Sequence, residues 1–445
     1  MNRHSLKALA EWLNISVSDA RVIHRVEQDS RKVQEGDLFV ALKGQRSDGH
    51  AHLHEVAQKG AYAALVSKEY QGEHFGLVLL AVDDVLAAVQ KIAACAYASN
   101  PKKVVAVTGS VGKTTTKEFI AQLLSSAFKT AKTPGNMNSQ VSLPLFILND
   151  LFDEEVCVVE MGMSEPGNIA QLVKMIPPDI AVITKIALAH AAYFPDGLSG
   201  IAREKADIFS HPNTQVGLMN VQAAGFQEIA GLGSCSKVIY GLEADGGEKD
   251  FVLRRGERGF QILEKGVATS WFTLPFTASH LCENFLGAAA VARELGLSWD
   301  QILECAPKMD VYPQRFESIK RNGITFINDA YNANPASMKA ALENLPKPNS
   351  SGKTIAVLGE MREMGRFSEA GHQEVAECAL QHVDHVLCLG EFTKLIASRF
   401  QEANKPGEHF LSIDELKIRV MGLAQEGDVV LIKGSNSLQL WKVLD

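Results

Sequence analysis

The chain has 445 residues, of which 46% are hydrophobic and 22% charged, and its formal net charge at pH 7 is -8. This length exceeds one ordinary core and suggests about two to four domains. The acidic balance argues against a general nucleic-acid or anionic-membrane surface, and no run of about 18 apolar residues predicts a membrane span. Seven scattered cysteines without a C-x-x-C pair, and a start without a signal-peptide pattern, favour reduced thiols and a cytoplasmic protein.

The first block of the sequence is predicted to be a small α/β unit without a phosphate loop of its own. An amphipathic helix is expected at the start, followed by strands within 36–44 and 61–67 and a helix over 52–60. A longer helical pattern over 82–100 leads to the next block. We therefore predict an N-terminal domain over residues 1–82.

The second block alternates apolar strands with helical patterns, which is typical of a parallel sheet. Short polar strands are expected over 241–270, and a helix over 279–295. We predict a central parallel-sheet domain over residues 83–313. Its expected strands are Val104–Thr108, Val156–Met161, Ile180–Lys185 and Val238–Tyr240.

The third block, residues 314–445, repeats the alternation on a smaller scale. The segments "ITFINDAY", "TIAVLGEM", "HVLCLGE" and "VVLIKGS" are apolar strands that each run into a turn. We predict a C-terminal Rossmann-like α/β domain there, so the fold class is α/β with three domains. The active site is expected between blocks, at the carboxyl ends of the strands.

The segment "VVAVTGSVGKTTTKEF" predicts a phosphate-binding loop between a strand and a helix. Backbone N–H groups of a glycine-containing turn and a helix N-terminus converge on an anion, while a lysine spans phosphate oxygens and a threonine hydroxyl ligates Mg²⁺. The loop is a shortened form, G-x-x-G-K-T, with Val107 at the position of the first glycine in the strict pattern. The alternative is an ordinary strand–turn–helix. The expected nucleotide-binding residues are Gly109, Ser110, Val111, Gly112, Lys113, Thr114 and Thr115.

Three further side chains follow the strands of the central block. Glu160 ends the strand "VCVVE" and could ligate a hard cation, or serve as a capping or salt-bridge residue. His190 ends "IAVITKIALAH" at the same edge, where a single histidine is more often structural. Lys205 falls within a helical pattern, where lysines are normally solvated. Each residue alone is a weak signal.

These motifs, read with four other segments, resemble the Mur ligase family of peptidoglycan synthesis. Asp29–Ser67 is similar to the family's uridine-binding module, and Thr133–Leu148 to its muramoyl-substrate loop. His280 and Asn284 form its H-x-x-x-N pattern. "NDAYNANPASMKAAL" is typical of members that add a dipeptide. The resemblance extends over essentially the whole chain, and the family uses the shortened phosphate loop.

The resemblance implies an ATP-dependent amide ligase that adds D-alanyl-D-alanine to UDP-N-acetylmuramoyl-tripeptide. ATP phosphorylates the peptide carboxylate, the amine attacks the acyl phosphate, and phosphate leaves. Both the carboxylate and the γ-phosphate are anionic, so cations must neutralise their approach. The resemblance also implies a monomer without a nucleic-acid partner, and closure of the third domain over ATP.

The resemblance assigns cation chemistry to five residues. Lys113 contacts the phosphates. Thr114 and Glu160 hold a first Mg²⁺, while His190 and a carbamylated Lys205 hold a second. Reaction with CO₂ replaces a cation by a carboxylate-like ligand, and it requires a deprotonated amine, which an apolar or cation-rich surrounding favours. Lys113, His190 and Lys205 are thus the expected catalytic residues.

The remaining expected site residues divide by ligand. For adenine and ribose the resemblance implies Asn284, Arg315 and Asp329. For the uracil nucleotide end it implies Ser30 and Arg31, since a guanidinium offers paired donors to a diphosphate. For the muramoyl-peptide and the incoming dipeptide or the nucleotide edge it implies Asn136, Asn138, Ser139, Tyr331, Asn332, Asn334 and Ser337.

The sequence departs from the family pattern at several positions. Ser139 and Ser142 stand where the substrate loop usually has Asn and Gly. Gln314 replaces a glycine before Arg315. Asn436 replaces the arginine of K-G-S-R, and because asparagine carries no charge, the binding of the substrate's anionic groups is expected to differ.

Two other functions stay open at this point. A phosphate-loop kinase or NTPase would release ADP without an amine substrate, although it leaves the segments Asp29–Ser67 and Asn328–Leu342 unexplained. A binding protein derived from a ligase would account for the departures, although Lys113, Thr114 and Glu160 are all retained.

Overall fold

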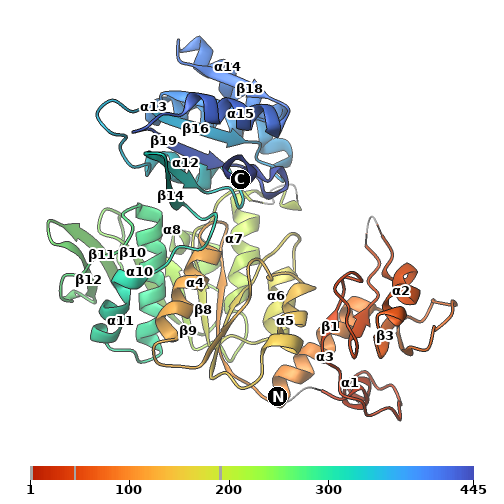
Figure 1. Ribbon diagram of the computed structural model, residues 1–445. Coiled ribbons are helices and arrows are strands. Elements are labelled where there is room, and N and C mark those ends of the chain that lie inside the picture. Colours follow the sequence, from red (N-terminus) through yellow and green to blue (C-terminus); the bar gives the residue numbers. More distant parts are fainter. Residues whose placement is uncertain (1–3, 45–46, 190–192) are drawn as a thin grey trace.

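The computed structural model describes residues 4–44, 47–189 and 193–445 and contains three separate β-sheets. In Figure 1 the N-terminal part lies to one side of the central part, and the C-terminal part lies above it. All three sheets are dominated by parallel pairs and carry helices, so the predicted α/β class is confirmed. None of the helices in these ranges is both long enough and apolar enough to cross a membrane.

The N-terminal sheet has four parallel strands in the order β1-β2-β3-β4. It is joined to the central part by reciprocal hydrogen bonds of 2.8 and 2.9 Å between the Asn149 side-chain amide and the backbone of Val26. A long helix after this sheet packs against the central helices α5 and α6. The elements are α1 (Leu6–Trp12), β1 (Val26–Glu27), β2 (Leu38–Val40), η1 (Gly49–His52), α2 (Leu53–Gln58), β3 (Ala63–Ser67), β4 (Val78–Val82) and α3 (Val85–Ser99).

The central sheet has nine strands in the order β13-β12-β11-β10-β9-β8-β5-β7-β6, parallel from β6 to β11. Its middle strands are buried on both faces, which explains their continuous apolar sequences. The strands are β5 (Lys103–Thr108), β6 (Thr130–Lys132), β7 (Val156–Glu160), β8 (Ile180–Ile183), β9 (Val216–Asn220), β10 (Ser236–Leu242), β11 (Phe251–Gly256), β12 (Gly259–Glu264) and β13 (Val267–Ala268). The helices are α4 (Lys113–Leu124), α5 (Ser142–Asp150), α6 (Asn168–Met175), α7 (Leu198–Ala206), η3 (Asp207–Phe209), α8 (Val221–Ala224), α9 (Gln227–Ala230), α10 (Ser279–Glu294), α11 (Trp299–Cys305) and η4 (Ala306–Lys308).

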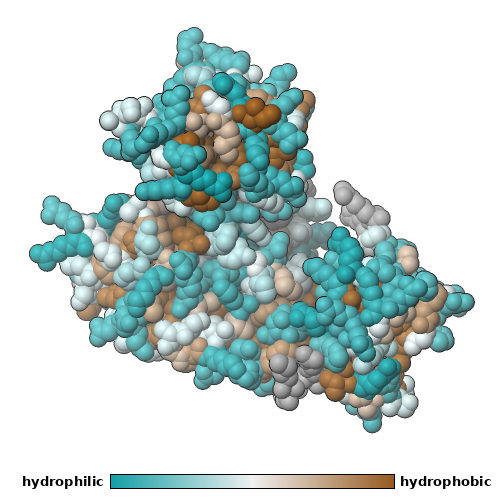
Figure 2. Space-filling view, in the orientation of Figure 1, coloured by the Kyte–Doolittle hydropathy of each residue, from teal (hydrophilic) through white to brown (hydrophobic). Residues whose placement is uncertain are grey.

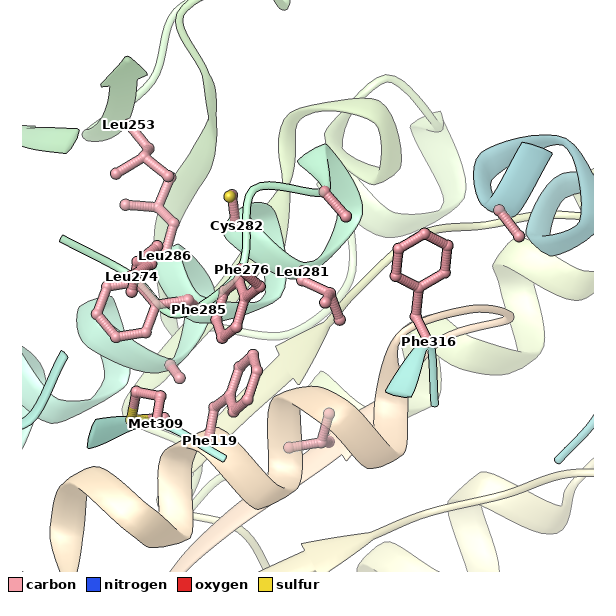
Figure 3. Packing of buried hydrophobic residues seen from close by; sticks show 14 of the residues in the cluster. Phe119, Leu253, Leu274, Phe276, Leu281, Cys282, Phe285, Leu286, Met309 and Phe316 are labelled. Carbon is pink, nitrogen blue, oxygen red and sulfur yellow. The ribbon is translucent and has the colours of Figure 1, made fainter. Parts of the chain in front are cut away.

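Helices α4 and α10 are packed together by a buried apolar cluster (Figure 3). The rings of Phe119 on α4 and Phe276 just before α10 stack with centroids 5.3 Å apart. Phe119 and Phe285 are fully buried, and truncating such a side chain to alanine costs about 3–5 kcal/mol. This packing fixes the loop before α4 against the first turns of α10.

The C-terminal sheet has six strands in the order β14-β15-β19-β16-β17-β18, with β14 as an antiparallel edge. Figure 2 shows hydrophobic patches on this part within a largely hydrophilic surface. The strands are β14 (Glu317–Arg321), β15 (Ile324–Asn328), β16 (Thr354–Gly359), β17 (His385–Leu389), β18 (Gly407–Phe410) and β19 (Val429–Lys433). The helices are α12 (Pro335–Glu343), η5 (Gly365–Phe367), α13 (Ser368–His382), η6 (Glu391–Thr393), α14 (Lys394–Glu402), α15 (Ile413–Leu423), η7 (Asn436–Leu438) and η8 (Leu440–Leu444).

Six of the described strands have no counterpart among the expected ones, namely β1, β4, β6, β9, β14 and β18. β6 is short and partly exposed, so it lacks an apolar run. β9 contains Gly217, which weakens the strand pattern; a Cβ there would lie 2.9 Å from the Cys235 Sγ atom. β14 is an edge strand with mostly exposed polar residues. Short or edge strands of this kind carry little periodic signal.

Candidate active site

A cavity of about 790 Å³ lies between the carboxyl ends of the central strands and the C-terminal part. Most of the residues expected at the site line it, although they come from segments between positions 109 and 337 of the chain. They are Gly109, Ser110, Val111, Gly112, Lys113, Thr114, Thr115, Asn136, Asn138, Ser139, Glu160, Lys205, Asn284, Arg315, Asp329, Tyr331, Asn332, Asn334 and Ser337.

Two glycines of the phosphate loop are required by their conformation and surroundings. Gly109 has a φ of +149°, and a Cβ there would lie 1.8 Å from the Thr184 Oγ1 atom. Gly112 has a φ of +89°, and a Cβ there would lie 2.5 Å from the Asn284 Oδ1 atom. Both values of φ favour glycine. The loop therefore approaches β8 and α10 as closely as backbone allows, and its N–H groups begin α4.

A hydrogen-bond chain connects the loop to the end of β7. The Thr114 hydroxyl donates to Glu160 Oε2 at 2.8 Å and accepts from Arg315 Nη2 at 2.8 Å. Glu160 is 1% exposed, and its Oε1 accepts from Asn138 Nδ2 at 2.7 Å. A hydroxyl and a carboxylate are hard oxygen donors of the kind that Mg²⁺ prefers. The sequence prediction thus corresponds to one compact group of side chains.

The segment after β6 is held against α4 by hydrogen bonds from a buried lysine of that helix. The ammonium of Lys117, which is 0% exposed, donates to the carbonyls of Thr133 and Gly135 at 2.5 and 3.0 Å. The Thr133 hydroxyl accepts from the Glu160 backbone N–H at 3.0 Å. This loop therefore has its position set by the same helix that begins at the phosphate loop.

Lys205 is buried in the cavity wall and is 2% exposed. Burial, and then the nearby charge of Lys113, lower the pKa of Lys205 well below the ordinary lysine value. Burial also lowers the pKa of Lys113, against the effect of Glu160, and the Lys113 ammonium donates to the Gly109 carbonyl at 2.9 Å. His190, the fourth residue predicted to bind metal, lies outside the described residues.

The C-terminal part supplies a second ion pair to the cavity. Lys433, 2% exposed at the end of β19, lies 2.6 Å from Asp329 Oδ2 and donates to the Asn332 carbonyl at 3.1 Å. The guanidinium of Arg315 lies over the Tyr331 ring at 3.8 Å from its centroid. Tyr331 and Arg315 thereby join the C-terminal wall to Thr114.

Several family departures have direct structural counterparts. Gln314 has a φ of +61°, in the left-handed region that glycine adopts without strain. The hydroxyls of Ser139 and Ser142 lie 2.9 Å apart, and Ser142 Oγ also accepts from the Ser139 N–H at 3.0 Å. Asn436 donates to the Tyr331 carbonyl at 3.1 Å. Each of these residues has a local role in shaping a loop of the site.

Asn334 and Ser337 have a structural role besides lining the cavity. Asn334 Oδ1 accepts from the Ser337 N–H at 2.8 Å, and the Ser337 hydroxyl accepts from the Asn334 N–H at 3.1 Å. This reciprocal pair is the capping box of α12. Pro335 is the first residue of α12, a position at which proline is favoured because no hydrogen bond is lost there.

Ser30 and Arg31 lie apart from the cavity, in the N-terminal part. Arg31 has an 85% exposed side chain and forms a two-point pair with Asp29, with distances of 2.8 and 2.7 Å. That hydrogen bonding lowers the pKa of Asp29 to about 2. The Ser30 carbonyl accepts from Lys59 Nζ at 2.7 Å. The structure does not bring these two residues together with the phosphate loop.

Sequence reasoning missed several charged residues of the site. Lys185 follows β8 and pairs with Glu283, 5% exposed on α10, at 2.6 Å. Lys433 lies in "VLIKGS", where a lysine after four buried residues was a usable signal. Lys117 is in the first turns of α4, where a lysine is normally exposed, so the sequence carried no sign of its burial.

His280 also lines the cavity, at the start of α10. Burial lowers the pKa of His280 to about 4, and its ring meets that of Phe316 edge-on with centroids 4.8 Å apart. Its Nδ1 atom is buried without a hydrogen-bond partner among the described residues. The ring is therefore a neutral apolar contact between α10 and the start of the C-terminal part.

Comparisons with known proteins agree with this architecture. Family models match as the Mur ligase family catalytic domain over residues 22–125, the Mur ligase middle domain over 107–292, and the glutamate ligase domain of Mur ligases over 314–436. The chain therefore belongs to the Mur ligase family, a family of ATP-dependent ligases.

Within that family, the full-length relatives are UDP-N-acetylmuramoyl-tripeptide–D-alanyl-D-alanine ligases. The one from Bacillus subtilis is 31% identical, covering 100% of this chain and 98% of its own. The one from Escherichia coli is 32% identical, covering 99% and 97%.

Solved structures of the same kind are also similar. MurF from Acinetobacter baumannii has a TM-score of 0.86 at 27% identity, covering 100% of this chain and 98% of its own. MurF from Thermotoga maritima, in complex with ADP, has a TM-score of 0.80 at 30% identity, covering 95% and 96%.

Proposed function

We propose that this chain joins D-alanyl-D-alanine to the peptide carboxylate of UDP-N-acetylmuramoyl-tripeptide, converting ATP to ADP and phosphate, in the synthesis of peptidoglycan precursors. One observation carries the proposal: a single cavity unites the phosphate loop with the N-D-A-Y-N-A-N-P segment. The names of the full-length relatives and the ADP bound to the Thermotoga enzyme support it.

ATP binds with its phosphates on the loop before α4. The loop N–H groups and the Lys113 ammonium bind the β- and γ-phosphates, because several backbone donors and one cation converge there. Asn284, Arg315 and Asp329 bind the nucleoside end. Lys113 is half-buried, and a cation in such a partly dehydrated place interacts more strongly with a transferring phosphoryl group than one in bulk water does.

The donor set beside the loop fits Mg²⁺. Thr114 and Glu160 provide the hydroxyl and carboxylate oxygens that hold one ion. A second ion is assigned to Lys205 and to His190, which lies outside the described residues. Bound there, Mg²⁺ neutralises the developing phosphate charge.

Lys205 becomes a ligand of this second ion by carbamylation, together with His190. The uncharged amine attacks CO₂, an N–C bond forms, and the amine releases one proton to leave an anionic carbamate. The burial that lowers the pKa of Lys205 favours the uncharged amine, which is the form that reacts with CO₂. The product turns a costly buried cation into an oxygen ligand.

The reaction then proceeds in two displacements on the substrates. The tripeptide carboxylate attacks the γ-phosphorus, ADP leaves, and an acyl phosphate forms. The uncharged amine of the dipeptide attacks the acyl carbon, the nitrogen loses one proton to phosphate or solvent, and the tetrahedral intermediate expels phosphate as the amide forms. Asn136, Asn138 and Ser139 contact the muramoyl-peptide, and Tyr331, Asn332, Asn334 and Ser337 the dipeptide side of the cavity.

The N-terminal part binds the uridine diphosphate end of the substrate through Ser30 and Arg31. The three sheets fall within residues 1–82, 83–313 and 314–445, which we propose as the domains. We further propose that the enzyme acts as a monomer in the cytoplasm, where UDP-linked precursors and ATP are both available.

The test is ADP formation with UDP-N-acetylmuramoyl-tripeptide, measured with and without D-alanyl-D-alanine. We expect turnover that depends on the dipeptide. Turnover indifferent to the dipeptide would indicate an NTPase or kinase. A complete lack of turnover, with nucleotide binding retained, would indicate a binding protein derived from a ligase.

A further inference from the structure

The starting point is a charge requirement within the proposed function. The incoming dipeptide presents its amine to the acyl phosphate and carries a carboxylate at its other end. Burying that carboxylate in a cavity already lined by acidic side chains and phosphates is costly unless a cation pairs with it. The cavity must therefore supply a cation on the side away from the phosphate loop.

Most cations of the described cavity wall are already engaged. Lys433 pairs with Asp329 and Lys185 with Glu283, each at 2.6 Å. Arg315 donates to Thr114 and stacks on Tyr331. The lysines Lys113 and Lys205 belong to the phosphate side.

Arg362 differs from these residues. Its side chain is 51% exposed, and its Nε atom forms only a long ion pair with Glu360 Oε2, at 3.7 Å, beyond hydrogen-bonding distance. Its guanidinium donates through one nitrogen, Nη1, to the Ser437 hydroxyl at 2.9 Å. Its Nη2 nitrogen has no hydrogen-bond partner among the described residues, and together with Nη1 it can donate to a planar anion.

The backbone around Arg362 is held in place from a neighbouring loop. Arg362 follows β16, and its N–H donates to the Ser435 hydroxyl at 2.8 Å; Ser435 follows β19 and donates its own N–H to the Glu360 carbonyl at 3.2 Å. Strands β16 and β19 are adjacent and parallel, so these loops meet at one edge of the sheet. The guanidinium is thus mounted on two joined loops, which limits the entropy lost on binding.

Asn436 lies between these two serines and carries no charge. Its amide donates to the Tyr331 carbonyl, so it serves the loop and not an anion. The nearby charge comes from Arg362 instead. We propose that Arg362 binds the terminal carboxylate of the incoming dipeptide and selects for a free carboxylate at that end; this inference rests on the proposed function.

The experiment combines a change in the substrate with a change in the enzyme. Steady-state kinetics compare D-alanyl-D-alanine with D-alanyl-D-alaninamide, whose terminus is uncharged, on the wild type, Arg362→Met, Arg362→Lys and the control Arg399→Met. Arg399 is a half-exposed arginine of α14 that pairs with Glu377. Melting temperatures establish that each variant is folded.

We expect the amide to raise KM on the wild type by about 30-fold, and Arg362→Met to raise KM for the dipeptide by a similar factor, as for loss of a charge-assisted pair. On Arg362→Met the amide and the dipeptide should have equal KM, while KM for ATP and for the muramoyl-peptide stay unchanged. Arg362→Lys should keep part of the preference for the dipeptide over the amide. The control Arg399→Met should keep the full preference of the wild type.

Two results would overturn the inference while leaving the proposed function intact. One is a wild type that uses both substrates equally well. The other is an Arg362→Met variant that still prefers the dipeptide as strongly as the wild type does. If the wild type shows no turnover that depends on the dipeptide, the proposed function fails and this inference fails with it.

Discussion

Polar side chains such as Glu160 beside the phosphate loop are buried, whereas the Arg31 side chain expected to bind substrate in the N-terminal part is exposed. Beside the loop, Glu160 is 1% exposed with hydrogen bonds to both carboxylate oxygens, and Lys205 is 2% exposed. In the N-terminal part, Arg31 is 85% exposed and pairs with its neighbour Asp29. In the proposed function, the groups beside the reacting atoms are thus enclosed and held in place before substrate binds, whereas the proposed contact to the uridine diphosphate end lies on the surface.

The largest effect that this contrast predicts is at Lys205. Lys205→Ala should lower kcat by about 10³-fold, the loss typical of a key charge-stabilising group, and formate or acetate should restore part of the activity. Initial rates of ADP release measure both. The control is Lys174→Ala, an exposed lysine of α6. Normal activity in Lys205→Ala would mean that enclosure at this position serves folding alone.

A second effect follows from the enclosure of His280. Its folded pKa of about 4 lies below the unfolded value of 6.5, so the unfolded chain takes up the proton first. The stabilisation that comes from keeping His280 neutral is present above about pH 6.5 and is lost as the pH falls toward 4. Between pH 6.5 and 5 this group alone removes roughly 2 kcal/mol.

Replacing the ring should reveal that contribution. His280→Phe should lose less melting temperature between pH 7 and pH 5 than the wild type does, because it has no proton to gain. His74→Gln, a change at an exposed histidine, should follow the wild type. Identical acid sensitivity in all three proteins would contradict the lowered pKa of His280.

A third effect tests whether the substrate loop depends on α4. Lys117→Met leaves the carbonyls of Thr133 and Gly135 without their buried donor. We expect KM for UDP-N-acetylmuramoyl-tripeptide to rise about tenfold, with KM for ATP changed less than about twofold. Steady-state kinetics at saturating dipeptide give both values. Equal increases would show that the lysine supports the whole site and not the loop.

The smallest effect is expected at the exposed handle. Arg31→Ala should raise KM for the UDP-linked substrate by about fivefold, as for one surface charge contact, and leave kcat and the melting temperature unchanged. Because the contact is exposed, added salt should reduce the difference between variant and wild type. A fall in kcat would indicate that the handle also aligns the reacting carboxylate, and it would remove the contrast between the two regions.

The α/β class, the phosphate loop and Glu160 followed from local pattern, whereas the other expected residues of the cavity lining came from the family resemblance. Strands buried on both faces, such as β5 and β7, have continuous apolar sequences, and the polar groups after them lie at one edge of the sheet. Chemical type plus position after a strand was therefore sufficient for Glu160 and the loop glycines.

The charged pairs of the site could not be predicted this way. The pairs Lys185–Glu283 and Lys433–Asp329 join residues 98 and 104 positions apart, and Lys117 is buried only because the segment after β6 crosses over it. Nothing in the local sequence records which distant acid or carbonyl a lysine will meet. The arrangement of the three sheets decides these contacts.

The two serines of the substrate loop have a consequence for how this sequence can change. Ser139 and Ser142 hydrogen-bond to each other through their hydroxyls, at the two positions where the loop departs from its relatives' pattern. Replacing Ser142 alone by glycine would remove the partner of both the Ser139 hydroxyl and the Ser139 N–H. The two side chains are therefore energetically coupled, and the cost of changing one is expected to depend on the residue present at the other.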